Sequence, residues 1–271
     1  MNPDGPRRIG LIAGSGGIPP YFAEKARAGG LQLVSIGFTD EIARKLAPFS
    51  EKSLCIGLGR VAKILDTLKE ESVRDLVILG KVDKRVIFRP QMFDLRSLKF
   101  LKEVKNKQDK TLLVGVIEEL EKEGFKVLDQ RELLGEIYPA KGVLSRRQPS
   151  PAEREDIEFG LPIAKKMADM EIGQTLIVKD KTVIAVEAVE GTDQAIRRGS
   201  ELARGGCVVV KVSRTGQDYR YDSPGAGPDT LESLVAGGAS VLALEAGRVM
   251  LVDEAEVVRR ADEAGISVIA V

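Results

Sequence analysis

The sequence predicts an α/β protein with two domains, the first built on a parallel sheet and the second on a mixed sheet. In the first half, short apolar runs alternate with segments of helical periodicity, which is typical of parallel strands joined by helices. In the second half, residues 174–190 and 240–253 each hold two apolar runs separated by a short turn, which is typical of hairpins. A polar stretch containing prolines separates the halves, and 271 residues suit two modest domains.

The first half begins with a strand, a glycine turn and a helix in residues 7–30. Residues 75–82, "DLVILGKV", are short and continuously apolar, so they indicate a strand buried on both faces. Apolar residues at helical spacing predict one or two helices within 97–124. The remaining expected elements are strands at 31–38 and 53–59, a helix at 60–72, and a short strand and turn at 126–134.

We place the first domain at residues 1–136, a linker at 137–150 and the second domain at 151–271. The stretch "SPAERED", 150–156, indicates a helix N-terminus with acidic residues in its first turn. The first hairpin turns at 179–181. The other expected elements are helices at 192–206 and 254–265, strands at 207–212 and 266–271, and a helix near Pro228 with Asp229 and Thr230 as cap residues.

Composition narrows the function classes. Hydrophobic residues make up 43% and charged residues 30% of the chain, which provides for a full core. The formal net charge is zero and no basic run occurs, which argues against a nucleic-acid partner. No apolar run is long enough to span a bilayer, and the N-terminus lacks the apolar segment of a signal peptide. We therefore expect a cytoplasmic protein.

The chain has no histidine. This excludes Ser-His-Asp and Cys-His catalysis as well as zinc held by histidine. Catalysis must then use carboxylates, Lys, Arg, hydroxyls, backbone N–H groups or a hard cation held by oxygen. Cys55 and Cys207 stand far apart in apolar stretches, and we expect both to be small buried residues.

Two features of the first half suggest a site for anions. Gly14, Ser15, Gly16 and Gly17 follow a strand and precede a helix, so backbone N–H groups and the helix dipole can face a phosphate or sugar. The alternative is that these residues only form a tight turn. Pro19 stands where a dinucleotide-binding motif has its third glycine, so the stretch is weak evidence for NAD binding. Lys81 follows a parallel strand, where ligands collect, although a surface lysine would fit as well.

The second half concentrates acids and cations in two segments. Glu187, Glu190 and Asp193 lie within seven residues at a strand exit and would repel one another without a cation; a solvated hairpin edge with Asp193 as a helix cap is the alternative. The loop that begins at Lys211 carries Asp218, Arg220 and Asp222. This mixture of residues suits a magnesium–phosphate site, in which carboxylates hold the metal ion and Arg or Lys binds the phosphate oxygens.

These motifs resemble the LpxI family of UDP-2,3-diacylglucosamine diphosphatases of lipid A biosynthesis. The matching stretches are "GLIAGSGGIP", "LGKV", "IGQTLIVKDKTVIAVEAVEGTD" and "KVSRTGQDYRYDSPGAGPDT", in the same order and over nearly the whole chain. The resemblance implies a hydrolase of Gram-negative lipid metabolism with a Rossmann-like N-terminal domain and a distinct C-terminal domain. It implies a magnesium-dependent pyrophosphatase, manganese being an alternative cation, that releases UMP and 2,3-diacylglucosamine 1-phosphate by attack on the glucosamine-side phosphorus.

Carried over by position, the resemblance implies the following roles. Asp222, Asp218 and Lys211 are expected to be catalytic, and Asp222, Asp218, Glu187 and Glu190 are expected metal ligands. Because the chain has no histidine, a carboxylate is the natural proton acceptor, and we expect Asp222 to take this role. The expected substrate-binding residues are Gly14, Ser15, Gly16, Gly17, Lys81, Gln174, Thr192, Arg220 and Thr230. The expected substrate is an amphipathic UDP-sugar lipid, so we also expect peripheral contact with the inner face of the inner membrane. A homodimer is a further expectation.

Some positions depart from the family pattern. Gly225 and Ala226 stand where we expect threonine and isoleucine, and Gln108 precedes Asp109 where a pair of acids is usual. Two other functions stay open. One is an NAD(P)-linked oxidoreductase, suggested by the first glycine turn, and the other is a UDP-sugar sensor without catalysis.

Overall fold

A computed structural model describes residues 7–81, 94 and 109–271. The chain divides into two compact units, Met1–Leu133 with Tyr219–Asp222, and Leu134–Asp218 with Ser223–Val271. The division falls after Leu133, while the boundaries at 136 and 150 stay predictions. The segment Tyr219–Asp222 therefore packs with the first unit, although it comes from the second half of the sequence.

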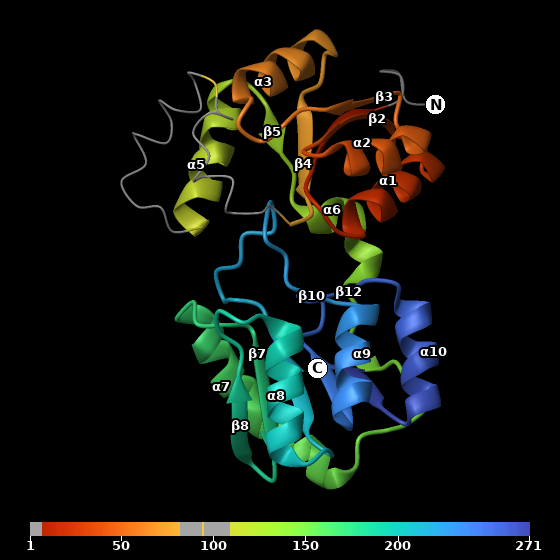
Figure 1. The fold of residues 1–271 in the computed structure, drawn as a ribbon, viewed down its shortest axis with the longest axis vertical. Helices are drawn as coiled ribbons and strands as arrows, with labels where there is room; N and C mark the ends of the chain where they lie inside the picture. The colour runs from red at the N-terminus through yellow and green to blue at the C-terminus, as the bar shows by residue number, and fades with distance from the viewer. Residues whose placement is uncertain (1–6, 82–93, 95–108) are drawn as a thin grey trace. The chain divides into compact units, whose positions relative to one another are not determined.

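The first unit contains a five-stranded sheet in the order β3-β2-β1-β4-β5, in which all neighbours are parallel. Its strands are β1 (Arg8–Ala13), β2 (Gln32–Gly37), β3 (Lys52–Cys55), β4 (Asp75–Leu79) and β5 (Lys126–Val127). Its helices are α1 (Ile18–Ala28), α2 (Asp40–Leu46), α3 (Val61–Glu70), α5 (Asp109–Lys122) and α6 (Gln130–Leu134), which Figure 1 labels, and the short η1 (Ala47–Phe49). The predicted parallel sheet is confirmed.

Two helices of the first unit, α2 and α5, bear on the predicted elements in different ways. Helix α2 was not predicted; Thr39 caps it, because its hydroxyl accepts from the N–H of Ile42 at 3.4 Å. Helix α5 lies within the helical stretch predicted at 97–124, of which residues 97–108, Gln108 included, lie outside the described residues, as does Val82.

One part of the core of the first unit lies between the sheet and the pair α3 and α5. Strand residues such as Ile12, Ile36 and Leu76 pack with Leu65 of α3 and Ile117 of α5 in one buried cluster. Helices α1 and α2 pack against β2. Because the central strands are covered by helices, they read as continuous apolar runs in the sequence.

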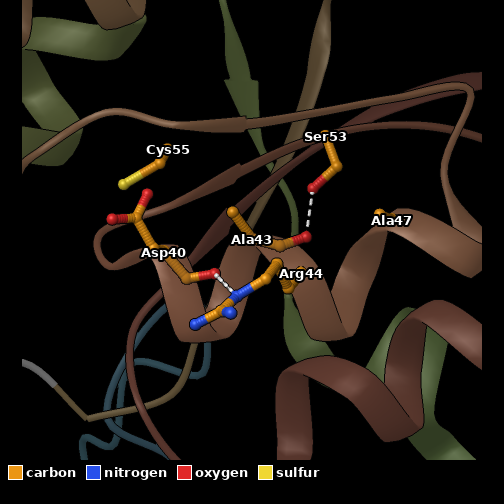
Figure 2. Close-up of a pocket in the computed structure, with 6 residues that line it drawn as sticks. All are labelled: Asp40, Ala43, Arg44, Ala47, Ser53 and Cys55. Carbon is orange, nitrogen blue, oxygen red and sulfur yellow. Dashed lines mark hydrogen bonds between the residues drawn. The ribbon is translucent and has the colours of Figure 1, made fainter.

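A surface depression in the first unit is bordered by α2 and β3 (Figure 2). Asp40 and Arg44 line it together with Cys55, which is exposed at the edge strand. The prediction that Cys55 is buried is wrong, because β3 has only one neighbour in the sheet, whereas Cys207 is buried as predicted. Partial burial and the nearby Asp40 carboxylate raise the pKa of the Cys55 thiol, which disfavours the nucleophilic thiolate.

The second unit contains a six-stranded mixed sheet in the order β6-β13-β11-β9-β7-β8. Strands β9, β11 and β13 are parallel, while β6 and β7 run against their neighbours. Its strands are β6 (Gly142–Val143), β7 (Thr175–Lys179), β8 (Thr182–Val186), β9 (Val208–Lys211), β11 (Val241–Leu244) and β13 (Ser267–Ala270). The helices of the unit are η4 (Gly135–Ile137), α7 (Pro151–Asp169), α8 (Thr192–Ala203), α9 (Pro228–Gly237) and α10 (Glu254–Ala264).

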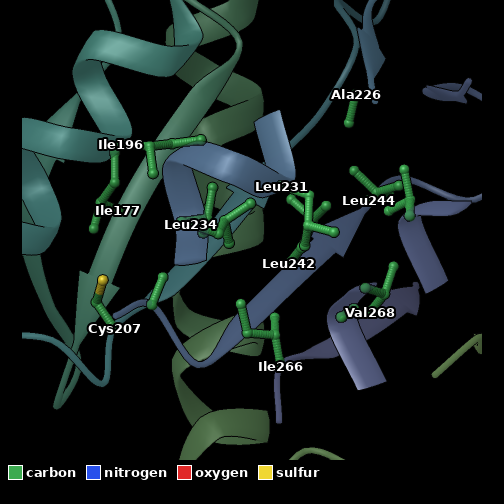
Figure 3. Packing of buried hydrophobic residues seen from close by; sticks show 14 of the residues in the cluster. Ile177, Ile196, Cys207, Ala226, Leu231, Leu234, Leu242, Leu244, Ile266 and Val268 are labelled. Carbon is green, nitrogen blue, oxygen red and sulfur yellow. The ribbon is translucent and has the colours of Figure 1, made fainter. Parts of the chain in front are cut away.

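Helices cover both faces of this sheet. Alternate strand residues such as Leu176 and Val210 pack against α7. The intervening residues, such as Ile177 and Leu242, pack against α8, α9 and α10 (Figure 3). This alternation follows from the two-residue period of a strand. No helix among residues 7–81 and 109–271 is both long and apolar enough to cross a membrane.

The first predicted hairpin is confirmed and the second is wrong. Strands β7 and β8 are antiparallel and turn at Asp180 and Lys181, whose φ values are 50° and 52°. In residues 240–253, β11 instead pairs with β9 and β13, and β12 (Met250–Leu251) pairs in parallel with β10 (Gly225–Ala226) in a separate two-stranded sheet. Every residue of β11 is buried, so a central place between two parallel partners suits it better than a hairpin.

The predicted helix caps had mixed outcomes. The start of α7 is confirmed, because Ser150 and Glu153 form a reciprocal capping box. For α9 the prediction is wrong, because Gly227 is the N-cap residue and Asp229 and Thr230 lie inside the helix. At α8 the N-cap is Gly191, so Asp193 does not cap it. Part of the expected linker, Gly142–Val143, forms the edge strand β6.

The glycine turn yields a prediction about stability. A Cβ added at Gly14 would lie 2.3 Å from the carbonyl oxygen of Lys81. The same carbonyl accepts the N–H of Ser15, so it cannot move without breaking that bond. We expect Gly14→Ala to lower the free energy of unfolding by about 1–3 kcal/mol, measured by urea denaturation.

The matched control is Gly17→Ala. A Cβ there meets nothing within 4 Å, and the φ of Gly17 is −81°. The cost should stay below about 1 kcal/mol. Equal urea midpoints for the two variants would contradict the role of the close approach at Gly14.

Candidate active site

Two of the predicted substrate-binding motifs meet in the first unit. Ser15 and Lys81 form an isolated antiparallel bridge, with both N–H···O distances at 2.8 Å. The N–H of Gly14 also donates to the carbonyl of Leu79 at 2.8 Å. The glycine turn and the end of β4 are therefore one structure at the carboxyl edge of the sheet, where ligands of open α/β sheets bind.

The exposed part of this turn leads into helix α1. Ser15, Gly16 and Gly17 are exposed, and no side chain caps the helix. The helix dipole and the N–H groups of Gly17 and Ile18 favour an anion there, whereas Pro19 and Pro20, the next two residues of the helix, have no N–H to donate. Gly16 has a φ of 109°, a conformation that glycine adopts without strain.

A second polar cluster surrounds Lys211 in the second unit. Lys211 is 4% exposed and ends β9. Its Nζ donates to the hydroxyl of Thr175 at 3.0 Å and to that of Thr192 at 2.7 Å. It also lies 3.9 Å from Oε2 of Glu187. The Thr192 hydroxyl in turn donates to Oε1 of Glu187 at 2.8 Å, so it joins the cation and the carboxylate.

The fold explains why these residues meet. Thr175 lies opposite Lys211 in the register of β7 and β9. Glu187 follows the end of β8, and Thr192 is the first residue of α8. Gly173 allows a close approach, because a Cβ there would lie 2.1 Å from the carbonyl oxygen of Glu187. The cluster thus lies at the edge where β8 and β9 both end.

Gln174 connects this cluster to the loop after β9. Its N–H donates to Oε2 of Glu187 at 3.2 Å, and its side-chain Nε2 donates to Oε1 of Gln217 at 3.0 Å. The side chain of Arg214 also donates to Oε1 of Gln217, at 3.2 Å. Three residues predicted from sequence, Lys211, Thr192 and Gln174, are therefore brought together around Glu187.

Sequence reasoning missed a second network at the start of this loop. Lys165 donates to Oε1 of Glu245 at 2.6 Å, and Ser213 donates to Oε2 of Glu245 from its N–H and its hydroxyl, both at 2.9 Å. Burial opposes ionisation of Glu245, but these hydrogen bonds outweigh it and lower the pKa of the carboxyl. Arg248 donates to the carbonyls of Arg214 and Thr215 at 2.6 and 3.1 Å. The network holds the first residues of the loop in place.

Glu190 lies apart from the Lys211 cluster in its contacts. Its Oε1 accepts from Arg198 at 2.5 Å and its Oε2 from the N–H of Ala188 at 3.2 Å. The backbone N–H of Glu190 itself and the guanidinium of Arg198 lower the pKa of this carboxyl. These contacts stabilise the turn between β8 and α8.

The remaining predicted residues lie on the loop or beyond it. Arg220 donates to Oε1 of Glu121 at 2.8 Å, within the first unit. Asp222 belongs to the same unit and has a left-handed backbone with a φ of 48°. Asp218 belongs to the second unit and is half-buried, and Thr230 is buried in α9.

The four predicted metal ligands are divided between the two units. Asp222 belongs to the first unit, whereas Asp218, Glu187 and Glu190 belong to the second. Within residues 7–81, 94 and 109–271, no group of three or more acidic or cysteine side chains is arranged to hold a metal ion.

Comparisons with known proteins agree with the motifs. The model of the LpxI N-terminal domain matches residues 8–137, and that of the LpxI C-terminal domain matches residues 140–269. A curated relative from Caulobacter vibrioides, UDP-2,3-diacylglucosamine pyrophosphatase LpxI, is 33% identical over 98% of both chains.

Solved structures are less similar. A glycinamide-RNase-transformylase T from Mycobacterium tuberculosis is 13% identical, with a TM-score of 0.26, over 68% of this chain and 44% of that one. The WlbA dehydrogenase from Thermus thermophilus, in complex with NAD and UDP-GlcNAcA, is 16% identical, with a TM-score of 0.27, over 63% of this chain and 64% of that one. Likenesses this weak carry no argument about fold or function. The two domain models and the full-length relative show that the chain belongs to the LpxI family.

Proposed function

We propose that this protein hydrolyses the pyrophosphate bond of UDP-2,3-diacylglucosamine, a step of lipid A biosynthesis, and releases UMP and 2,3-diacylglucosamine 1-phosphate. The observation that carries the proposal is the match over 98% of both chains to a relative named for this pyrophosphatase activity. The oxidoreductase and sensor alternatives gain no support from that match.

The Lys211 cluster supplies chemistry that suits a pyrophosphate. The Lys211 ammonium lies beside Thr192, the first residue of α8, so a cation and a helix N-terminus favour the same anion. The ammonium is held in place by hydrogen bonds to the hydroxyls of Thr175 and Thr192 and by the nearby carboxylate of Glu187. Phosphoryl transfer depends on positioning and on stabilising charge at the phosphoryl oxygens, and a fixed lysine provides both.

Acidic residues would complete the reaction. Because the chain has no histidine, a carboxylate is the natural group to accept a proton from the attacking water. We assign this role to Asp222. Asp222 is exposed, and it belongs to the stretch "KVSRTGQDYRYDSPGAGPDT" that carries the resemblance to the family.

Magnesium dependence is part of the proposal. The four acids predicted as ligands offer carboxylate oxygens, the donors that Mg²⁺ prefers, and Mg²⁺ often uses only one or two carboxylates together with substrate phosphates. Asp222 is exposed and Asp218 is half-buried, so neither residue is closed off from an ion that keeps its waters. Asp222 and Asp218 would hold the ion, which when bound lowers the pKa of a coordinated water and offsets phosphoryl charge.

The test is UMP release from UDP-2,3-diacylglucosamine in detergent micelles, followed by chromatography. We expect UMP and the sugar 1-phosphate in equal amounts, loss of activity with EDTA, and recovery with excess Mg²⁺. Hydrolysis in H₂¹⁸O should place the label in the sugar phosphate. The absence of UMP at any Mg²⁺ concentration would refute the function, and activity unaffected by EDTA would refute only the metal. The cytoplasmic location, the membrane contact and the homodimer stay predictions.

A further inference from the structure

The segment Tyr219–Asp222 is the one part of the second half of the sequence that packs with the first unit. Its two tyrosines are buried, Tyr219 at 3% exposure and Tyr221 at 4%. Tyr221 belongs to the same buried cluster as Ile12 of β1, Leu65 of α3 and Ile117 of α5. The tetrapeptide is therefore anchored in the core of the first unit.

Helix α6 provides the polar half of this anchor. The N–H of Gln130 donates to the carbonyl of Tyr219 at 2.8 Å. The guanidinium of Arg131 stacks over the Tyr219 ring, 3.8 Å from its centroid. Arg131 is in turn held by Asp129, at 2.6 Å. A neutral hydrogen bond and a cation–π contact thus fix one end of the tetrapeptide.

Gln130 also connects the tetrapeptide to the glycine turn. Its side chain is buried, and its Nε2 donates to the carbonyl of Ile78 in β4 at 2.7 Å. The next residue, Leu79, accepts the N–H of Gly14. The anchor of the tetrapeptide and the turn at Gly14 therefore share the last two residues of β4.

We infer that Gln130, Tyr219 and Tyr221 are positioning residues, which fix Asp222 at the edge of the first unit that carries the glycine turn. The role of Asp222 itself rests on the proposed function. Asp222 directly follows the buried Tyr221 and takes the left-handed conformation as the chain leaves the core. Asp222 therefore comes from the second half of the sequence but belongs structurally to the first unit.

The experiment compares Tyr221→Ala with Tyr221→Phe in the full-length protein. We expect Tyr221→Ala to lower kcat by about 10²-fold, because a small misplacement of a catalytic group costs that much, and to change KM by less than about threefold. Tyr221→Phe keeps the ring and should stay within about threefold of the parent in kcat. The control is Tyr21→Ala, which removes a tyrosine of α1 whose ring lies 5.6 Å from Nζ of Lys25.

A second readout does not depend on activity. The amide of Gln130 donates to Tyr219, whereas the amide of Leu128 donates to Leu76 within the unit's own sheet. Hydrogen exchange of the Gln130 amide should become at least about tenfold faster in Tyr221→Ala, while that of Leu128 stays unchanged. If Tyr221→Ala does not fold, Arg131→Met removes the cation–π contact together with the partly exposed ion pair to Asp129. We expect about 3- to 10-fold faster exchange and slower turnover.

The outcomes separate the inference from the proposed function. Unchanged exchange at Gln130 in a folded Tyr221→Ala or Arg131→Met variant would overturn the anchor. Faster exchange with unchanged kcat would overturn the positioning role. A parent protein that releases no UMP would refute the proposed function, and with it the role of Asp222, while the exchange result would still decide whether the tetrapeptide is anchored as described.

Discussion

Replacing Asp222 by asparagine is expected to lower kcat for UMP release by about 10²–10³-fold, with little change in the folded structure. The substitution removes the negative charge and keeps the shape of the side chain. Asparagine also tolerates the left-handed backbone at this position, where φ is 48°. Circular dichroism and steady-state kinetics at saturating Mg²⁺ measure the two effects separately.

Asp253→Asn is the matched control for this prediction. Asp253 is exposed and has a similar φ of 54°, but it lies at the N-cap of α10. The substitution there should leave kcat within about twofold of the parent, since surface changes away from a site have small effects. An Asp222→Asn enzyme that turns over as fast as Asp253→Asn would remove Asp222 from the mechanism.

The second large effect is expected at Lys211. Lys211→Met should lower the free energy of unfolding by about 3–5 kcal/mol, because it leaves the Glu187 carboxylate in a largely buried place without its cation. The Glu187 side chain is 14% exposed and that of Lys211 is 5% exposed. Urea denaturation followed by circular dichroism measures this loss, and UMP release should fall by at least about 10²-fold in the same variant.

A double variant tests the reason for this effect. Adding Glu187→Gln to Lys211→Met removes the uncompensated charge, so part of the lost stability should return while activity does not. Lys181→Met serves as the control for removing a lysine, since Lys181 pairs with Glu155 on the surface, where both side chains are more than half exposed, and it should cause no measurable change. Equal stability of Lys211→Met and the parent would show that the buried pair contributes nothing.

Local pattern predicted most elements but not every pairing. The apolar run Asp75–Leu79 and the turn at Asp180 and Lys181 carry their structure in neighbouring residues, so both were predicted correctly. Strand β11 was placed in a hairpin because its sequence neighbour β12 is also apolar, whereas its partners are β9 and β13. Periodicity shows that a strand is buried but does not show which strand pairs with it.

The candidate site shows the same limit. Lys211, Thr192 and Gln174 were found through motifs, but Thr175 was missed, because it reaches Lys211 only through the register of β7 and β9. Glu245, which is distant in sequence from the loop that it holds at Ser213, carried no local signal. Gln130 lies in a short helix whose sequence gives no reason to expect a contact with Tyr219.

By itself, the sequence determined the fold class, the absence of histidine chemistry, and the order of motifs by which the LpxI family is recognised, since these depend on composition and on residues close together in the chain. Only the tertiary structure decided that Thr175 and Thr192 enclose Lys211, and that Tyr219–Asp222 packs with the first unit. Both depend on strand register and on core packing between distant segments. Those contacts are selected by the burial of apolar surface over the whole fold, which no short stretch of sequence encodes.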